Sequence, residues 1–351
     1  MPILTAGRRS MMTADVDNAK REVIQAGKQL VKKELAARTW GNISMRISDT
    51  QFVITPSGLP YDTLTEDKIV TVNISDVSYE GHVRPSSEAG IHADVYRFRP
   101  LAGAVIHTHQ KAASAISVCA EGLFVESEKE RAVLGNMAPC TSYGMPGTKR
   151  LRRAVERTLS EYTESKGFLL PKHGALLVGP DLESAFLAAE TLEAAAERKY
   201  RRMVGENVSS RKRPPQLTKP LYIKIRRGCG AKHLIYSGEE ATLLFSKKGG
   251  KLAPWLDDLS QIAGVNIGCC PISDVKSIIK ELRHKNAVFI KGYGALCTGD
   301  TKADALAVKM ILEKGCMAAL YGEKSASARP LKNLDARIQR FVYQYQYSKS
   351  D

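Results

Sequence analysis

Apolar residues in the first part of the chain follow two periods, that of a helix and that of a strand. In residues 15–37 the apolar positions have the spacing of an amphipathic helix, with Val23, Ile24, Leu30, Val31 and Leu35 on its apolar face. Residues 39–58 (TWGNISMRISDTQFVITPSG) alternate apolar and polar positions around turn residues. This alternation predicts a β-hairpin.

The same two periods continue to about residue 203. Residues 85–100 predict a helix with Ser86 and Ser87 as candidate N-caps and Pro100 as its stop. The pattern then predicts a buried strand at residues 104–106 and a helix at 149–161. It also predicts two short strands around a tight turn at 166–179 and a long Ala-rich helix at 181–203. Helices that alternate with short strands predict a mixed α/β or α+β domain.

A linker is predicted near the middle of the chain. Residues 204–220 (VGENVSSRKRPPQLTKP) combine Gly, Ser, paired Pro and like charges. A length of 351 residues is compatible with two domains of ordinary size. We therefore expect a first domain over residues 1–205, a linker over 206–220 and a second domain over 221–351.

The second domain resembles a shortened copy of the first. Residues 291–313 align with residues 171–193 at an offset of 120, with seven identical residues. A fainter match, at an offset of 129, aligns residues 233–241 with residues 104–112. At these offsets the three histidines of the first copy are replaced in the second: His107 by Tyr236, His109 by Gly238 and His173 by Tyr293. The second copy therefore cannot bind a metal in the same way.

Two histidines follow the apolar run at residues 104–106. Side chains at i and i+2 of a strand share one face, so we expect His107 and His109 to lie side by side. Two imidazoles on one face can bind one metal ion. Taken alone, such a pair is more often two partly exposed histidines at the end of a strand.

Four segments of the first domain together indicate a family. They are TWGNIS (39–44), ITPSGLPY (54–61), PSSE (85–88), and HTH followed by KHG at His107, His109 and His173. In this order they resemble the class II aldolase/adducin family over nearly all of residues 15–202. The resemblance implies a three-layer α/β/α sandwich around a mainly antiparallel sheet, here followed by a smaller degenerate repeat of that fold.

The chemistry of these residues agrees with the resemblance. His107, His109 and His173 offer three neutral nitrogen ligands, the usual set for a catalytic Zn²⁺ that keeps one position open. Mn²⁺, Fe²⁺ or Co²⁺ are alternatives. The resemblance implies that Glu88 removes a proton from the carbon next to the metal-bound carbonyl. The alternative for Glu88 is an exposed carboxylate in the first turn of a helix, which the helix dipole favours.

By the same resemblance, six residues bind the substrate phosphate: Thr39, Asn42, Ser57, Gly58, Ser86 and Ser87. A helix N-terminus after the two serines would attract an anion, and Gly58 allows the backbone to approach closely. For each serine or threonine, a capping or turn hydrogen bond remains the alternative.

One position departs from the family. Where its sugar-phosphate aldolases carry a tyrosine from a neighbouring subunit, this chain has Glu128, and the next tyrosine is Tyr143. The second copy could act as a built-in neighbour, and at an offset of 129 Asp257 corresponds to Glu128. Asp257 is therefore predicted to complete the active site, with a purely scaffolding second domain as the alternative.

The leading interpretation is a zinc-dependent aldolase that cleaves or forms a carbon–carbon bond in a small phosphorylated ketose through a metal-stabilised enediolate. An epimerase, a dehydratase or a decarboxylase acting on a sugar phosphate would use the same site. A non-catalytic interaction protein, as adducin is, would keep only the fold. The retained histidines favour an enzyme, because a protein without metal chemistry has no need for three separated imidazoles and an acid.

The amino-acid composition indicates which classes of partner the chain can bind. The 52 Lys and Arg against 37 Asp and Glu give a net charge of +15, which favours an anionic partner such as a phosphorylated sugar or aldehyde. We find no nucleic-acid module, no apolar run of the roughly 20 residues that a membrane helix needs, and no signal peptide. Seven cysteines without a CxxC pair predict a cytoplasmic protein. A homo-oligomer is expected, because active sites in this family lie between subunits.

Overall fold

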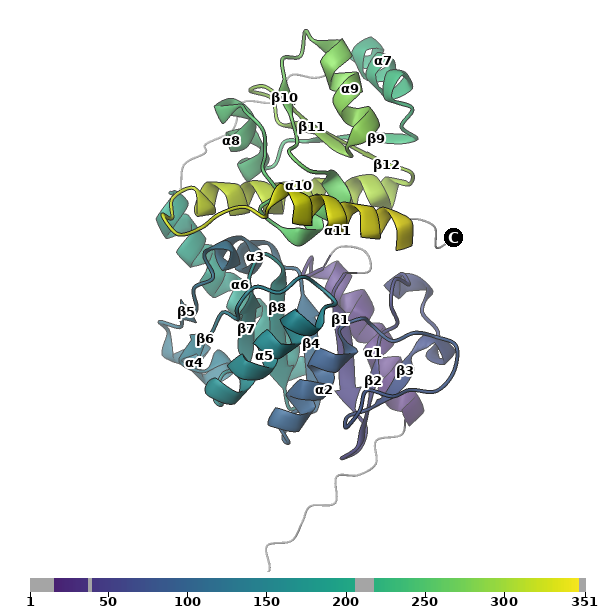
Figure 1. Ribbon diagram of the computed structural model, residues 1–351, viewed down its shortest axis with the longest axis vertical. Coiled ribbons are helices and arrows are strands. Elements are labelled where there is room, and N and C mark those ends of the chain that lie inside the picture. Colours follow the sequence, from purple (N-terminus) through teal and green to yellow (C-terminus); the bar gives the residue numbers. More distant parts are fainter. Residues whose placement is uncertain (1–15, 37–39, 206–217, 347–351) are drawn as a thin grey trace, which may run out of the picture.

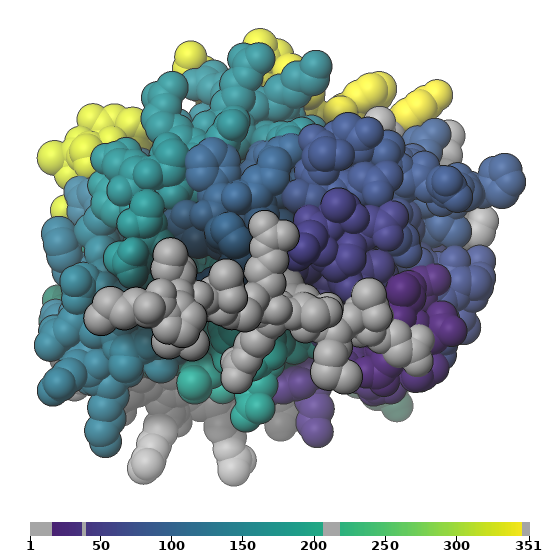
Figure 2. All heavy atoms as spheres, turned by 90° about the horizontal axis from the view of Figure 1, so that it is seen from below, coloured from purple at the N-terminus to yellow at the C-terminus, as the bar shows by residue number. Residues whose placement is uncertain are grey.

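The computed structural model describes residues 16–36, 40–205 and 218–346, which form two stacked halves (Figure 1). The N-terminal half, residues 16–205, lies at the bottom in purple to teal, and the C-terminal half, residues 218–346, lies above it in green to yellow. Seen from below, the described surface belongs mainly to the N-terminal half, with yellow C-terminal residues only at its edge (Figure 2).

A six-stranded antiparallel sheet forms the centre of the N-terminal half, in the order β3-β2-β1-β4-β8-β7. Its strands are β1 (Asn42–Arg46), β2 (Gln51–Ile54), β3 (Val70–Asn73), β4 (Ala104–Thr108), β7 (Gly167–Leu170) and β8 (Gly174–Gly179). The predicted hairpin at residues 39–58 is confirmed as the β1–β2 pair, in which Ser44 lies opposite Ile54. A separate two-stranded sheet joins β5 (Leu123–Phe124) and β6 (Met137–Ala138).

Helices cover both faces of this sheet. One face packs against α1 (Val16–Lys32), α3 (Lys111–Ile116) and α6 (Leu182–Val204), and the other against α2 (Ala89–Phe98) and α5 (Lys149–Glu161). The period of two along β4 explains this: Ala104 and Ile106 enter the first core and Val105 enters the second. The predicted three-layer sandwich around an antiparallel sheet is therefore confirmed. A short helix, α4 (Glu128–Leu134), lies beside α6.

The predicted start of α2 is wrong by one to two residues. Neither Ser86 nor Ser87 is the N-cap, because Glu88 takes that position and the helix begins at Ala89. The peptide N–H of Ser86 donates to the carbonyl of Thr55, so the backbone is still paired with the neighbouring loop at this point. The Ser86 hydroxyl accepts a hydrogen bond from the N–H of Glu88 at 3.3 Å.

The C-terminal half contains a four-stranded sheet in the order β10-β11-β12-β9. Its strands are β9 (His233–Ser237), β10 (Cys269–Cys270), β11 (Ala287–Ile290) and β12 (Ala295–Gly299), and its helices are α7 (Lys219–Cys229), α8 (Glu240–Lys248), α9 (Val275–His284), α10 (Lys302–Gly322) and α11 (Asn333–Gln346). Helices α7 and α9 cover one face of this sheet, while α8 and α10 cover the other. Helix α7 begins inside the linker predicted for residues 206–220, of which 206–217 lie outside the described residues.

The two halves share one apolar core. Helix α10 runs along the junction and packs against α3, as Figure 1 shows. The buried cluster that begins with Ala19 and Val23 of α1 continues through α6 into α10, and includes Leu312 and Cys316. The functional residues described below lie at this junction. Within the described ranges, no helix combines the length and apolar character needed to cross a membrane.

Candidate metal centre

The end of β4 and the turn between β7 and β8 bring three histidines together. His107 is on β4, opposite Leu176 of the neighbouring β8, and His109 follows directly after the strand. His173 precedes β8. The Nε2 atom of His107 lies 2.9 Å from that of His109 and 3.1 Å from that of His173. The three residues predicted as metal ligands thus converge on one point.

Glycine is required beside two of these histidines. A Cβ atom on Gly174 would lie 2.0 Å from the carbonyl oxygen of Thr108, so only glycine lets β8 approach β4 this closely. Gly41, with φ at 87°, lies in the same way against the backbone of His107. A Cβ atom on Gly41 would lie 2.6 Å from the carbonyl oxygen of His107. The glycines of the KHG and TWGNIS segments therefore place the backbone that carries the ligands.

The hydrogen bonds of the Nδ1 atoms fix the direction of the Nε2 lone pairs. The Nδ1–H of His107 donates to the carbonyl of Ala175 at 2.9 Å, because a carbonyl can only accept. The Nδ1–H of His109 donates to the carboxylate of Asp258 at 3.2 Å. Burial lowers the pKa of His107 to about 4 and that of His109 to about 3, so both rings are neutral at neutral pH.

Glu88 lies beside two of the three histidines. Its two carboxylate oxygens lie 3.2 Å from Nε2 of His173 and 3.4 Å from Nε2 of His107. Burial would raise the pKa of Glu88, but His107 and His173 hold it well below its ordinary value. Glu88 is 7% exposed and His107 1%, so this carboxylate and these rings lie out of bulk water.

The donor set fits a divalent cation. Two neutral Nε2 atoms 2.9 Å apart, each without a proton, repel one another unless a positive charge lies between them. Three imidazole nitrogens are a ligand set that Zn²⁺ takes, and Mn²⁺, Fe²⁺ and Co²⁺ accept the same set. Among the described residues, these three histidines are the one group of this kind in the structure.

Asn42 lies beside Glu88. Its Nδ2 donates to Glu88 at 3.0 Å, and its Oδ1 is bonded to Nε2 of His92. His92 is fully buried, its Nδ1 lies 2.6 Å from the hydroxyl of Ser44, and burial lowers its pKa to about 3. The neutral His92 therefore fixes the orientation of the Asn42 amide, and both ends of that amide are engaged within the protein.

The other residues predicted to bind phosphate lie in two adjacent loops. The N–H of Ser57 donates to the carbonyl of Arg84 at 3.1 Å, which places Ser57 and Gly58 beside Ser86 and Ser87. Ser86 is buried and Ser87 is exposed. Thr39 lies outside the described residues. The structure thus brings four of the six together in the loops that lead to Glu88, and Asn42 donates to the carboxylate of Glu88.

Residues of the C-terminal half reach the histidines. Asp258 bonds His109 as described, and Oδ2 of Asp257 lies 3.5 Å from Nδ1 of His173. Although burial opposes it, Lys314 and His109 lower the pKa of Asp258 below its ordinary value. The alignment at an offset of 129 is the signal that pointed to Asp257 and to its neighbour Asp258, and nothing in the sequence singled out Lys314. Glu128, in contrast, is an exposed residue at the start of α4.

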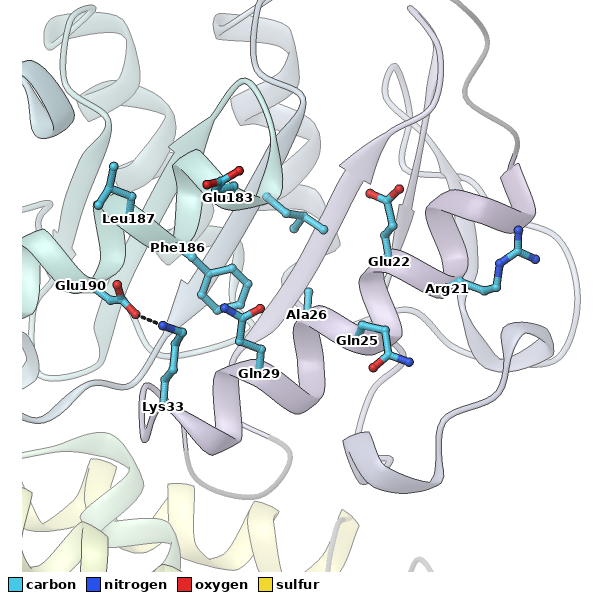
Figure 3. A pocket seen from close by; sticks show the side chains of 11 residues that line it. Arg21, Glu22, Gln25, Ala26, Gln29, Lys33, Glu183, Phe186, Leu187 and Glu190 are labelled. Carbon is cyan, nitrogen blue, oxygen red and sulfur yellow. Dashed lines mark hydrogen bonds and ion pairs between the residues drawn. The ribbon is translucent and has the colours of Figure 1, made fainter.

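A groove elsewhere on the surface contains none of these residues. It lies between α1 and α6, where Lys33 and Glu190 form an ion pair and Phe186 lines the floor (Figure 3). Charged and amide side chains line most of the α1 side of this groove. The three histidines and Glu88 lie instead at the junction of the two halves, where Asp258 contacts His109.

The N-terminal half of the chain is similar to proteins of known activity. The family model described as the Class II Aldolase and Adducin N-terminal domain matches residues 21–200. The chain is 33% identical over 177 residues to the L-fuculose phosphate aldolase of Escherichia coli (strain K12), a match that covers 50% of this chain and 80% of that protein. It is 31% identical over 189 residues to the 5-deoxy-D-ribulose 1-phosphate aldolase of Bacillus thuringiensis, covering 53% and 87%.

A relative with another activity is also similar. The 3-oxo-tetronate 4-phosphate decarboxylase of Pectobacterium atrosepticum is 27% identical over 203 residues, covering 54% of this chain and 91% of that protein. Among solved structures, an L-fuculose 1-phosphate aldolase is 31% identical, with a TM-score of 0.49, and covers 54% of this chain and 89% of its own.

Proposed function

Because this chain belongs to the class II aldolase and adducin family, we propose that it is a divalent-metal-dependent aldolase, a lyase that cleaves or forms a carbon–carbon bond in a small phosphorylated ketose. One observation carries the proposal: the Nε2 atoms of three histidines converge beside the carboxylate of Glu88. Zinc is the cation we expect at this site, with Mn²⁺, Fe²⁺ and Co²⁺ as alternatives.

Glu88 is the proton-transfer group in this proposal. A divalent cation held by the histidines supplies Lewis acidity that polarises a substrate carbonyl. In the bond-forming direction, Glu88 takes the proton from the carbon next to that carbonyl, and the aldehyde oxygen gains a proton and becomes a hydroxyl. In cleavage that hydroxyl loses its proton, and Glu88 returns a proton to the same carbon. The hydrogen bond from Asn42 keeps the Glu88 carboxylate oriented toward the histidines.

The two adjacent loops supply the phosphate site in this proposal. Ser57, Ser86 and Ser87 would supply hydroxyls, and Gly58 and Ser87 backbone N–H groups, near the N-terminus of α2, where a negative charge is favoured. Thr39 belongs to the same predicted set. The Asn42 amide is hydrogen-bonded at one end to Glu88 and at the other to His92. In this proposal Asn42 therefore mainly holds the Glu88 carboxylate in place.

A decarboxylase is the second candidate, favoured by the similarity to a sugar-acid phosphate decarboxylase. Loss of CO₂ from a 3-oxo acid leaves negative charge on the carbon next to a carbonyl, which the same cation would stabilise and Glu88 would protonate. The two reactions share their metal and proton-transfer residues. They differ in the second product, which is an aldehyde for the aldolase and CO₂ for the decarboxylase.

We also propose that the C-terminal half is a degenerate copy of the aldolase fold that has lost the metal ligands. Two pairs of equivalent contacts support this. Glu193 of α6 accepts hydrogen bonds from two N–H groups in the first turn of α3, and Glu313 of α10 does the same at α8. A Cβ on Gly174 would lie 2.0 Å from the carbonyl oxygen at the end of β4. A Cβ on Gly294 would lie 2.2 Å from the carbonyl oxygen at the end of β9.

An assay of bond cleavage tests the aldolase. The zinc-loaded chain, incubated with ketose 1-phosphates such as L-fuculose 1-phosphate, should release dihydroxyacetone phosphate and an aldehyde. The double variant His107→Ala, His109→Ala should be inactive, whereas the control His233→Ala, at an exposed histidine of β9, should retain activity. If the chain releases CO₂ from a 3-oxo acid phosphate and no aldehyde from any ketose of the panel, its activity is that of a decarboxylase and the aldolase proposal is wrong.

A further inference from the structure

Two adjacent aspartates of the C-terminal half are buried against two of the histidines. Asp257 is 1% exposed and Asp258 2% exposed, and they immediately precede the short π-helix Leu259–Ala263. Consecutive residues on a helical turn point in different directions, so the pair can reach two different partners. Oδ2 of Asp258 lies 3.2 Å from Nδ1 of His109, and Oδ2 of Asp257 lies 3.5 Å from Nδ1 of His173.

Other buried groups fix these carboxylates. Lys314 of α10, 3% exposed, forms an ion pair with Asp258, and its ammonium also donates to the backbone carbonyl of His109 at 3.1 Å. Because a carboxylate in the interior is costly without a partner, this ion pair explains how Asp258 can be charged there. The ring and the backbone of His109 are thus both held from the C-terminal half.

Asp257 is anchored in a similar way. Its Oδ1 accepts hydrogen bonds from the hydroxyl of Tyr143 at 2.9 Å and from Nε2 of Gln339 at 2.6 Å. Its peptide N–H donates to the carbonyl of Lys172, directly before His173. Within the described residues, Oδ2 of Asp257 and Nδ1 of His173 have no hydrogen-bond partner, although they face one another. A small movement of either side chain closes this contact.

We propose that Asp257 and Asp258 are positioning residues of the metal centre, which hold the Nδ1–H groups of His173 and His109 and so direct both Nε2 lone pairs at the cation. A carboxylate that accepts from Nδ1 sets the tautomer and orientation of the ring and makes Nε2 a better donor. The C-terminal half, which lacks metal ligands of its own, thereby contributes to metal binding by the N-terminal half. This inference rests on the proposed function, in which the histidines hold a divalent cation.

Metal affinity measures this role directly. We would compare the full-length chain with Asp258→Asn and Asp257→Asn by competition for Zn²⁺ against a chromophoric chelator. Outer-shell partners of this kind are typically worth 10- to 100-fold in metal affinity, and we expect a loss in that range for Asp258→Asn. Co²⁺-loaded protein gives a second readout, because its visible absorption should shift when the histidine donors are reoriented.

Two further variants separate positioning from folding. Glu313→Gln is the matched control: this buried acid is adjacent to Lys314, but its hydrogen bonds lie within the C-terminal half, so Zn²⁺ affinity and the Co²⁺ spectrum should stay at wild-type values. Asp258→Asn with Lys314→Met removes both charges of the ion pair, so that no unpaired lysine is left in the interior. We expect it to lose metal affinity as Asp258→Asn does.

The outcomes distinguish this inference from the proposed function. Wild-type Zn²⁺ affinity in Asp258→Asn and in the double variant would overturn the positioning role, even if the chain cleaves a ketose phosphate. Weakened affinity in both, with no ketose cleaved by the metal-loaded wild type, would support the positioning role and overturn the aldolase. A wild-type chain that binds no Zn²⁺ or Co²⁺ would overturn both.

Discussion

Glu88 is the residue on which the proposed chemistry depends, and its surroundings fit a proton carrier. It touches two of the three converging histidines and accepts a hydrogen bond from Asn42. His92, neutral and buried, holds Asn42 in turn. A chain of short polar contacts thus fixes the carboxylate without neutralising it.

Replacement of Glu88 by glutamine tests its role. Glu88→Gln keeps the size of the side chain and an oxygen that can accept from Asn42, but it cannot take up or return the proton at the substrate carbon. Because proton transfer by a positioned group typically contributes 10²–10⁴-fold, we expect kcat to fall by about that factor. Metal content, measured in the same preparation, should stay near one ion per chain. A kcat within about twofold of wild type would contradict the assignment.

The pH dependence of stability should report the buried His92. Its pKa is about 3 in the folded chain, below the ordinary value of about 6.5, so the unfolded chain takes up a proton first as pH falls. The stabilisation by neutral His92 is complete above about pH 6.5 and is lost progressively toward pH 3. In urea unfolding at a series of pH values, His92→Gln should show a slope lower by about 1.4 kcal/mol per pH unit. Equal slopes in the two proteins would contradict this.

At the scale of elements, periodicity was sufficient where one face of a helix or strand is buried. The helix predicted at residues 149–161 is α5 (Lys149–Glu161), and the HxH pair does lie on one side of β4. The start of α2 was misplaced because pairing of Ser86 with the neighbouring loop, a long-range contact, keeps the backbone extended. Lys314 and Gln339 could not be predicted, because they lie far along the chain from the histidines that they help to position.

The two equivalent glutamates make a matched pair of element-scale variants. Glu193→Gln and Glu313→Gln each replace one accepting oxygen by an NH₂ group, which faces a backbone N–H in the first turn of α3 or α8. A buried donor left without its acceptor costs about 1–3 kcal/mol. We expect both variants to lose free energy of unfolding by that amount, as measured by urea titration. A loss in one variant only would argue against equivalent roles in a repeated fold.

At the scale of the whole molecule, the two halves are joined by one apolar core and by charged contacts at the metal centre. Helix α10 contributes to that core and also carries Lys314, which bonds Asp258 and the backbone of His109. Unfolding of either half would expose buried apolar residues of the other half to water. The chain should therefore unfold as one unit, and metal binding should stabilise both halves.

Calorimetry with and without a chelator tests this coupling. We expect one unfolding transition for the metal-loaded chain, and a lower Tm for the same single transition after the metal is removed. Free metal at 100 times its Kd adds about 2.7 kcal/mol to the free energy of unfolding. Two separate transitions, of which only one responds to the chelator, would show that the halves are independent.

The metal content of the purified full-length chain, compared with that of the His107→Ala, His109→Ala variant, shows whether these histidines hold a cation. We expect about one divalent ion per chain in the wild type, most simply zinc, and none in the variant. No metal in the wild type after reconstitution, or the same content in both proteins, would contradict a metal centre built from these histidines.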